Sequence, residues 1–259
     1  MQIKQFEDKN LAQFSYAILS DSGKKIVLID PSRNPKPYID YAKENNAHIE
    51  GIIETHPHAD FISSHLELNQ LTGAAIYTSS LVGAGYTHTA FDEGDKIELE
   101  NIKLIALKTP GHSPDSISIL LEHDGKQKAI FTGDTLFIGD CGRPDLREGA
   151  GNLRVTRLEL AKSMYHTLRD KLIPLDDDVI VYPAHGAGTL CGKDLSKDSS
   201  STIGKEKQTN WSLQPMTESE FTDSLLSDQP FIPAYFPYDV EVNRKGAKPF
   251  NESIASVKI

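Results

Sequence analysis

The chain has few cysteines and no long apolar run, and both absences limit what it can be. Its 259 residues include only two cysteines, Cys141 and Cys191, which excludes a fold held together by many disulfides. No apolar stretch approaches the roughly 20 residues that a membrane-spanning helix needs, and the N-terminus lacks the apolar core of a signal peptide. We therefore expect a cytoplasmic protein with no membrane partner and two free thiols.

An excess of positive charge is also missing. The chain carries 27 basic and 37 acidic residues, which gives a net charge of −10. Nucleic-acid-binding proteins favour a basic surface, so we expect no nucleic-acid partner. An anionic substrate stays compatible with this charge, because one arginine can reverse the field inside a cleft.

Hydrophobic patterning predicts an α/β chain. Strands and helices alternate up to about residue 77, and β ribbons dominate between residues 95 and 131. We expect a main domain over residues 1–190 and a C-terminal extension over 191–259 that packs on it. Residues 192–210 are polar and are expected on the surface, and the tail from Pro230 has little periodicity. Strands are predicted at 13–20, 25–30, 48–53, 74–77, 96–99, 102–107, 116–121, 128–131 and 179–182, and helices at 37–45, 61–72, 153–172 and 216–226.

Four short motifs place a histidine or an aspartate where a predicted strand ends. Histidine and carboxylate are ligands that zinc and iron prefer, and loops that follow neighbouring strands converge at one edge of a sheet. Taken singly, each side chain could be a surface histidine, a turn aspartate or a helix cap. Their joint order predicts a metal site. The motifs are Thr55-His56-Pro57-His58-Ala59-Asp60, Thr109-Pro110-Gly111-His112, Gly133-Asp134 and Pro183-Ala184-His185.

This series resembles the metallo-β-lactamase superfamily over roughly residues 2–190. The resemblance implies an α/β fold, an αββα sandwich of two mixed sheets with outer helices. Dinuclear hydrolases of the superfamily, glyoxalase II included, place a histidine directly after the aspartate of the first motif, where it helps to hold a second metal. This chain has Phe61 there, and phenylalanine has no donor atom. We therefore expect a single metal ion.

The stretch from Phe131 to Leu146 is similar to the persulfide dioxygenase branch of the superfamily. That resemblance implies one Fe(II) per chain, held by His56, His112 and Asp134, the two-histidine, one-carboxylate arrangement of non-haem iron oxygenases. It further implies that a second set of side chains orients the ligands or bound water, although these could be merely structural. Zinc with His58 as an extra ligand is the alternative metal reading. The second set is His58, Asp60 and His185.

The segment after Asp134 supplies the substrate-binding candidates. The planar guanidinium of Arg143 matches a carboxylate of glutathione or of a similar small thiol. Asp145 would fix this arginine or meet the substrate ammonium. A purely structural Arg143–Asp145 pair is the other interpretation. Tyr182 is a weaker candidate for the pocket wall.

Cys191-Gly192-Lys193 resembles a variant found in bacterial fusions of a persulfide dioxygenase with rhodanese domains. We expect Lys193 to lower the pKa of Cys191, and Cys191 either to receive persulfide sulfur or to be an inert thiol. The tail from Pro233 to Gly246 resembles the joint before a rhodanese domain. This implies a rhodanese domain or protein as a partner, and the family also suggests a homodimer.

The resemblance thus implies an Fe(II)-dependent persulfide dioxygenase that acts in sulfide detoxification. It would oxidise a small thiol persulfide with O2 to sulfite and thiol. Two other classes stay open: a zinc-dependent thioester hydrolase of the glyoxalase II type, which Phe61 argues against, and a non-catalytic sulfur relay or sensor that uses Cys191.

Overall fold

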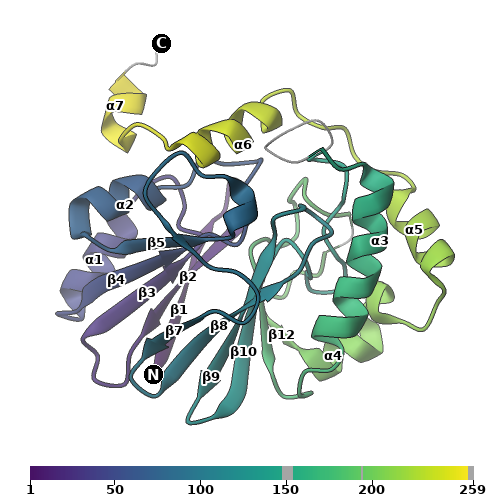
Figure 1. Cartoon of the computed structure of the whole chain (residues 1–259), viewed down its shortest axis with the longest axis horizontal. Helices are drawn as coiled ribbons and strands as arrows, with labels where there is room; N and C mark the ends of the chain where they lie inside the picture. Colours follow the sequence, from purple (N-terminus) through teal and green to yellow (C-terminus); the bar gives the residue numbers. More distant parts are fainter. Residues whose placement is uncertain (148–153, 194, 256–259) are drawn as a thin grey trace.

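The computed structural model describes residues 1–147, 154–193 and 195–255. Two six-stranded sheets pack face to face, and helices cover the outer face of each sheet (Figure 1). The predicted αββα sandwich of two mixed sheets is confirmed. Among the described residues, no helix is both long and apolar enough to cross a membrane.

The first sheet uses the N-terminal part of the chain. Its strands lie in sequence order, with antiparallel pairing from β1 to β3 and parallel pairing from β3 to β6. Helices α1 (Lys36–Glu44) and α2 (His65–Thr72) pack on its outer face. The strands are β1 (Gln2–Asp8), β2 (Gln13–Leu19), β3 (Lys25–Ile29), β4 (His48–Ile53), β5 (Ala75–Thr78) and β6 (Thr89–Ala90).

The second sheet has the order β12-β11-β10-β9-β8-β7, and β10 and β11 form its parallel pair. Its outer face is covered by α3 (Arg157–Thr167), which continues as a π-helical turn over Leu168–Leu172, and by α5 (Glu218–Leu226). Helix α4 (Ile203–Thr209) follows directly after β12. The strands are β7 (Lys96–Leu99), β8 (Ile102–Lys108), β9 (Ile117–His123), β10 (Lys126–Gly133), β11 (Ile180–Pro183) and β12 (Ser201–Thr202).

The central core lies between the two sheets. Tyr16 and Ile18 from the first sheet pack with Leu104, Ile119 and Phe131 from the second. All seven residues of β2 are buried, because helices cover one face of that sheet and the second sheet covers the other. Such two-sided burial gives continuous apolar runs instead of alternation, and the rigid sandwich positions the loops at the strand ends.

The C-terminal third differs from the sequence-based expectation. Residues 192–210, expected on the surface, contain α4 and the fully buried Glu206, whose carboxylate accepts hydrogen bonds from the Gly139 amide and the Asn210 side chain. The tail, expected to lack periodic structure, forms α6 (Phe236–Lys245) and α7 (Phe250–Ala255). Buried polar residues interrupt the apolar periodicity of these segments, which explains why the pattern did not reveal them.

Candidate metal centre

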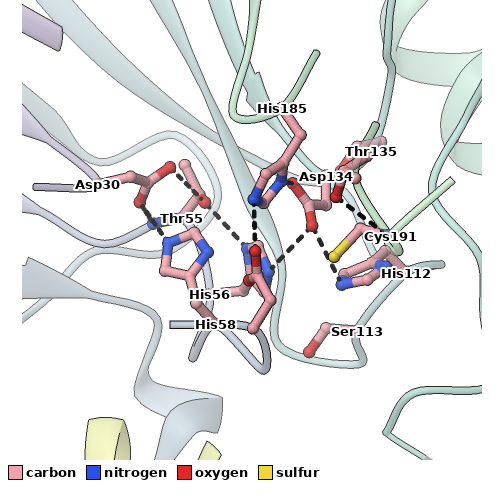
Figure 2. Close-up of polar contacts among 12 residues, drawn as sticks. Asp30, Thr55, His56, His58, His112, Ser113, Asp134, Thr135, His185 and Cys191 are labelled. Carbon is pink, nitrogen blue, oxygen red and sulfur yellow. Dashed lines mark hydrogen bonds and ion pairs between the residues drawn. The ribbon is translucent and has the colours of Figure 1, made fainter. Parts of the chain in front are cut away.

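Side chains from the four predicted motifs lie close together (Figure 2). His56 follows β4, His112 follows β8, Asp134 follows β10 and His185 follows β11. Ligand atoms of His56, His112 and Asp134 all lie within 4.8 Å of one another, and the three side chains are buried. The sequence placed these residues on separate loops, and the fold brings them together.

The facing atoms of this triad fit a metal ion. Asp134 Oδ2 lies 3.8 Å from His56 Nε2 and 3.6 Å from His112 Nε2. Both His56 Nε2 and Asp134 Oδ2 are buried without a hydrogen-bond partner. Buried polar atoms are nearly always paired. Two unpaired atoms turned toward one point therefore indicate a place where a cation binds. Two imidazole nitrogens and a carboxylate oxygen suit zinc or iron.

The remaining nitrogens of the two ligand histidines are held by the protein. His56 Nδ1 lies 3.0 Å from Thr55 Oγ1, which in turn donates to Asp30 Oδ2 at 2.8 Å. His112 Nδ1 lies 2.9 Å from the carbonyl oxygen of Arg143. Partners of this kind fix the tautomer and the orientation of a metal-binding imidazole. Sequence reasoning missed Asp30, although its place directly after β3 matches that of the other site residues.

The electrostatics prepare the triad for a cation. Burial lowers the pKa of His56 well below its usual value and also lowers the pKa of His112, which favours the neutral form that binds a metal. Burial opposes ionisation of Asp134, but the neighbouring His185, His112 and His56 outweigh it and lower the pKa of this carboxyl.

His185 connects two carboxylates. Its Nδ1 lies 2.7 Å from Asp134 Oδ1 and its Nε2 lies 2.8 Å from Asp60 Oδ2. One oxygen of Asp134 is therefore committed to His185, and the other is directed to the triad. Asp60 Oδ1 is buried without a hydrogen-bond partner. His185 and Asp60 thus lie where groups that orient a ligand would lie.

His58 belongs to a different cluster. Its Nε2 is 3.2 Å from Asp30 Oδ1 and 3.8 Å from Glu54 Oε2, and these three residues form a separate buried group. Burial opposes the charged imidazolium, but Asp30 and Glu54 raise the pKa of His58 to about 9. The ring stacks on Phe61 with the centroids 4.3 Å apart. Two carboxylates thus lie beside the His58 nitrogen, whereas the zinc alternative would use His58 as an extra metal ligand.

Glu54 is a second residue that sequence reasoning missed. It is buried, accepts a hydrogen bond from Ser63 Oγ at 2.7 Å and lies 3.5 Å from His65 Nδ1. It directly precedes Thr55, so an acidic residue beside the motif was the available signal. Its carboxylate joins the loop after β4 to the start of α2.

The Arg143 guanidinium is committed within the protein. Its Nε and Nη2 each donate to Asp145 at 2.7 Å, and further donors reach the carbonyl oxygens of Leu190 and Pro230. The side chain is only 1 % exposed. This geometry matches the structural pairing with Asp145 that the sequence left open, and binding of a substrate carboxylate by Arg143 stays a prediction.

Tyr182 lies on β11 in the core between the sheets. Its ring stacks on Phe131 at 5.4 Å and contacts Tyr16 at 5.3 Å. These contacts place one side of the ring against the inter-sheet core, and a position of Tyr182 on the pocket wall stays a prediction.

Cys191 lies beside the centre, grouped with Asp60 and His185. The expectation that Lys193 favours its thiolate is wrong. Burial raises the pKa of the Cys191 thiol well above its usual value, and the Asp60 and Asp134 carboxylates raise it further. The Lys193 ammonium instead donates to the carbonyl oxygens of Ser224 and Ser227.

Comparisons with known proteins agree with this architecture. Residues 10–185 match the family model of the metallo-beta-lactamase superfamily. Human mitochondrial persulfide dioxygenase ETHE1 is 32 % identical over 174 residues, which cover 66 % of this chain and 63 % of the relative. The cytoplasmic hydroxyacylglutathione hydrolase of Arabidopsis thaliana is also 32 % identical, over 175 residues with the same two coverages.

A solved structure is similar over almost the whole chain. The metallo-beta-lactamase from Staphylococcus aureus has a TM-score of 0.86 and 36 % sequence identity. The similarity covers 96 % of this chain and 73 % of that protein.

The fold and the buried triad together define a metalloprotein of the αββα class. The chain belongs to the metallo-beta-lactamase superfamily. Its match spans less than two thirds of the length of the two curated relatives named above. Those relatives divide between an oxygenase and a hydrolase at the same identity.

Proposed function

We propose that the chain is an Fe(II)-dependent persulfide dioxygenase, with His56, His112 and Asp134 as the iron ligands. The reaction converts a small thiol persulfide, O2 and water to the thiol, sulfite and two protons. Both oxygen atoms of O2 and one from water end in sulfite, and the terminal sulfur of the persulfide is oxidised. A small thiol such as glutathione is the carrier that we expect.

The observation that carries this proposal is the composition of the triad, in which two histidines and one carboxylate, His56, His112 and Asp134, come within 4.8 Å of one another. His58 Nε2 lies 3.2 Å from Asp30 Oδ1 and 3.8 Å from Glu54 Oε2. Phe61, which directly follows Asp60, has no donor atom for a metal. Two histidines and one carboxylate that leave coordination positions open are typical of non-haem iron oxygenases. When bound, Fe(II) supplies redox chemistry and positions for the persulfide and O2.

The protein's own groups orient the ligands and keep the site dry. Thr55 and His185 hold His56 and Asp134 through hydrogen bonds of 3.0 and 2.7 Å. The unpaired Oδ1 of Asp60 is available to accept a hydrogen bond from water or from the persulfide S–H. Because the triad is buried, bulk water is excluded and electrostatic interactions are strengthened.

A zinc-dependent thioester hydrolase is the second candidate, and one feature of the site favours it. Asp60, His185 and Cys191 form another buried or half-buried group of potential ligands beside the triad. A second ion there would give a two-metal centre of the kind found in hydrolases.

Metal analysis combined with an oxygen-electrode assay separates the two candidates. Protein loaded anaerobically with Fe(II) is mixed with glutathione persulfide, and O2 consumption and sulfite are measured together with metal content. We expect one iron per chain and one sulfite for each O2 consumed. Two zinc ions per chain, cleavage of S-lactoylglutathione and no oxygen uptake would overturn the proposal. The Asp134→Ala variant, which lacks a ligand, is the negative control.

A further inference from the structure

The C-terminal helix α6 contributes a buried amide to the loop that carries the metal motif. Asn243 Nδ2 donates to the carbonyl oxygens of His58 and Phe61, each at 2.8 Å, and the Ser63 amide donates to Asn243 Oδ1 at 2.8 Å. The residue is 2 % exposed. Both donor hydrogens and the acceptor oxygen are used, so the orientation of the amide is fixed.

These three bonds bracket the loop between His58 and Ser63. Within it, Asp60 reaches His185 at 2.8 Å, and His185 holds the ligand Asp134 at 2.7 Å. A backbone shift in this loop would therefore reach Asp134 through two hydrogen bonds. A loop has no strand ladder to pair its backbone groups, so a side-chain amide that binds three of them replaces the missing ladder.

Helix α6 is held firmly enough to act as a support. Phe236 and Val240 are fully buried against Ala59 and Cys191. Asp239 lies between them in sequence, and burial together with Asp60 raises its pKa to about 6. Residues 236, 239, 240 and 243 follow the i, i+3, i+4, i+7 spacing of one helix face.

The far end of α6 is anchored separately. The Arg244 guanidinium donates to the carbonyl oxygen of Val82 at 2.9 Å, and its own carbonyl accepts from the Gly85 amide at 2.8 Å. In Figure 1, α6 lies along the top of the molecule in the view. The helix is thus fixed on both sides of Asn243.

We propose that Asn243 is a positioning residue of the metal centre, which fixes the backbone from His58 to Ser63 so that Asp60 and His185 orient Asp134. The inference rests on the proposed metal site, but not on which reaction the metal serves. It also makes the segment after residue 190 a part of the site.

The test measures metal affinity and local protection instead of turnover. Zn(II) affinity is determined by competition with a chromogenic chelator for wild type, Asn243→Ala and Asn243→Asp. The Asp variant keeps the acceptor for the Ser63 amide but loses both donors. Tyr238→Ala, on the exposed side of the same helix, is the matched control. We expect about 10- to 100-fold weaker binding in both Asn243 variants and no change in the control.

Hydrogen exchange of the metal-free wild type is the second measurement and requires no variant. We expect the Ser63 amide to be protected as strongly as the amides of α6. Rapid exchange at Ser63, or Asn243 variants that lose stability but bind Zn(II) as tightly as wild type, would overturn the inference. If wild type bound metal but consumed no O2 with persulfide, the proposed function would fail and the role of Asn243 would still be measured.

Discussion

His185 Nδ1 lies 2.7 Å from Asp134 Oδ1, while Asp134 Oδ2 faces His56 and His112 without a hydrogen-bond partner. The carboxylate is thus divided between one oxygen that the protein holds and one that is left for a cation. This division makes the orientation of Asp134 depend on His185, which follows β11.

Replacement of His185 by alanine should therefore weaken metal binding. It would leave Asp134 Oδ1 and Asp60 Oδ2 without their shared partner. We expect a loss of about 10- to 100-fold in Zn(II) affinity, measured by chelator competition. His166→Ala, an exposed histidine on α3, should bind as wild type does. Equal affinities for wild type and His185→Ala would show that the bond does not orient Asp134.

Arg143 permits a test between its structural and its substrate-binding role. In Arg143→Met the buried carboxylate of Asp145 loses a bidentate partner, and a buried charge left unpaired typically costs about 3–5 kcal/mol. We expect urea unfolding to show a loss of this size, and the double variant Arg143→Met/Asp145→Leu to recover part of it. An unchanged unfolding free energy with a raised KM for persulfide would instead assign Arg143 to the substrate.

The raised pKa of Asp239 predicts a pH-dependent stability. Its folded value of about 6 lies above the ordinary 3.8, so the protonated form is favoured by folding. This contribution is fully present below pH 4 and is lost as the pH rises through 6. At pH 8 the free energy of unfolding of Asp239→Asn should exceed that of wild type by about 1–2 kcal/mol. At pH 4 the two proteins should differ little.

Glu241, on the same helix, is a control whose pKa is shifted in the opposite direction. Burial opposes its ionisation, but hydrogen bonds from Arg244 and Lys245 outweigh burial and lower its pKa. Glu241→Gln should therefore not stabilise the protein at pH 8. Urea unfolding at both pH values checks the pair, and an Asp239→Asn variant without any gain at pH 8 would contradict the assignment.

The strand-end motifs were predictable because each of these residues follows a strand. His56, His112, Asp134 and His185 lie within four residues of the ends of β4, β8, β10 and β11, and any sheet fold that aligns those strand ends collects their side chains. The same rule applied to β3 would have found Asp30. The sequence could not show which way each side chain points. His56 and His58 are two residues apart, yet His56 lies with His112 and Asp134, and His58 lies with Asp30 and Glu54.

The support from the C-terminal segment could not be read from the sequence. Asn243 is separated from His58 by 185 positions, and an isolated asparagine has no pattern that predicts its partners. Helix α6 buries an aspartate and an asparagine on its inner face. Hydrophobic periodicity therefore does not identify that face as buried. Long-range contacts of polar residues are fixed by the tertiary structure and leave little local signal.

Phe61 is the position at which one substitution should alter the metal content. Asp60 and His185 already lie 2.8 Å apart, and the Phe61 ring is 6.5 Å from the His185 ring. Phe61→His adds an imidazole donor beside both, which completes a second set of ligands. We expect zinc-loaded Phe61→His to bind close to two ions per chain by mass spectrometry, and the iron-loaded form to consume O2 more slowly. Phe61→Leu, which removes the ring without adding a donor, should stay at one ion. If Phe61→His also binds one ion, the missing donor does not decide how many ions the centre binds.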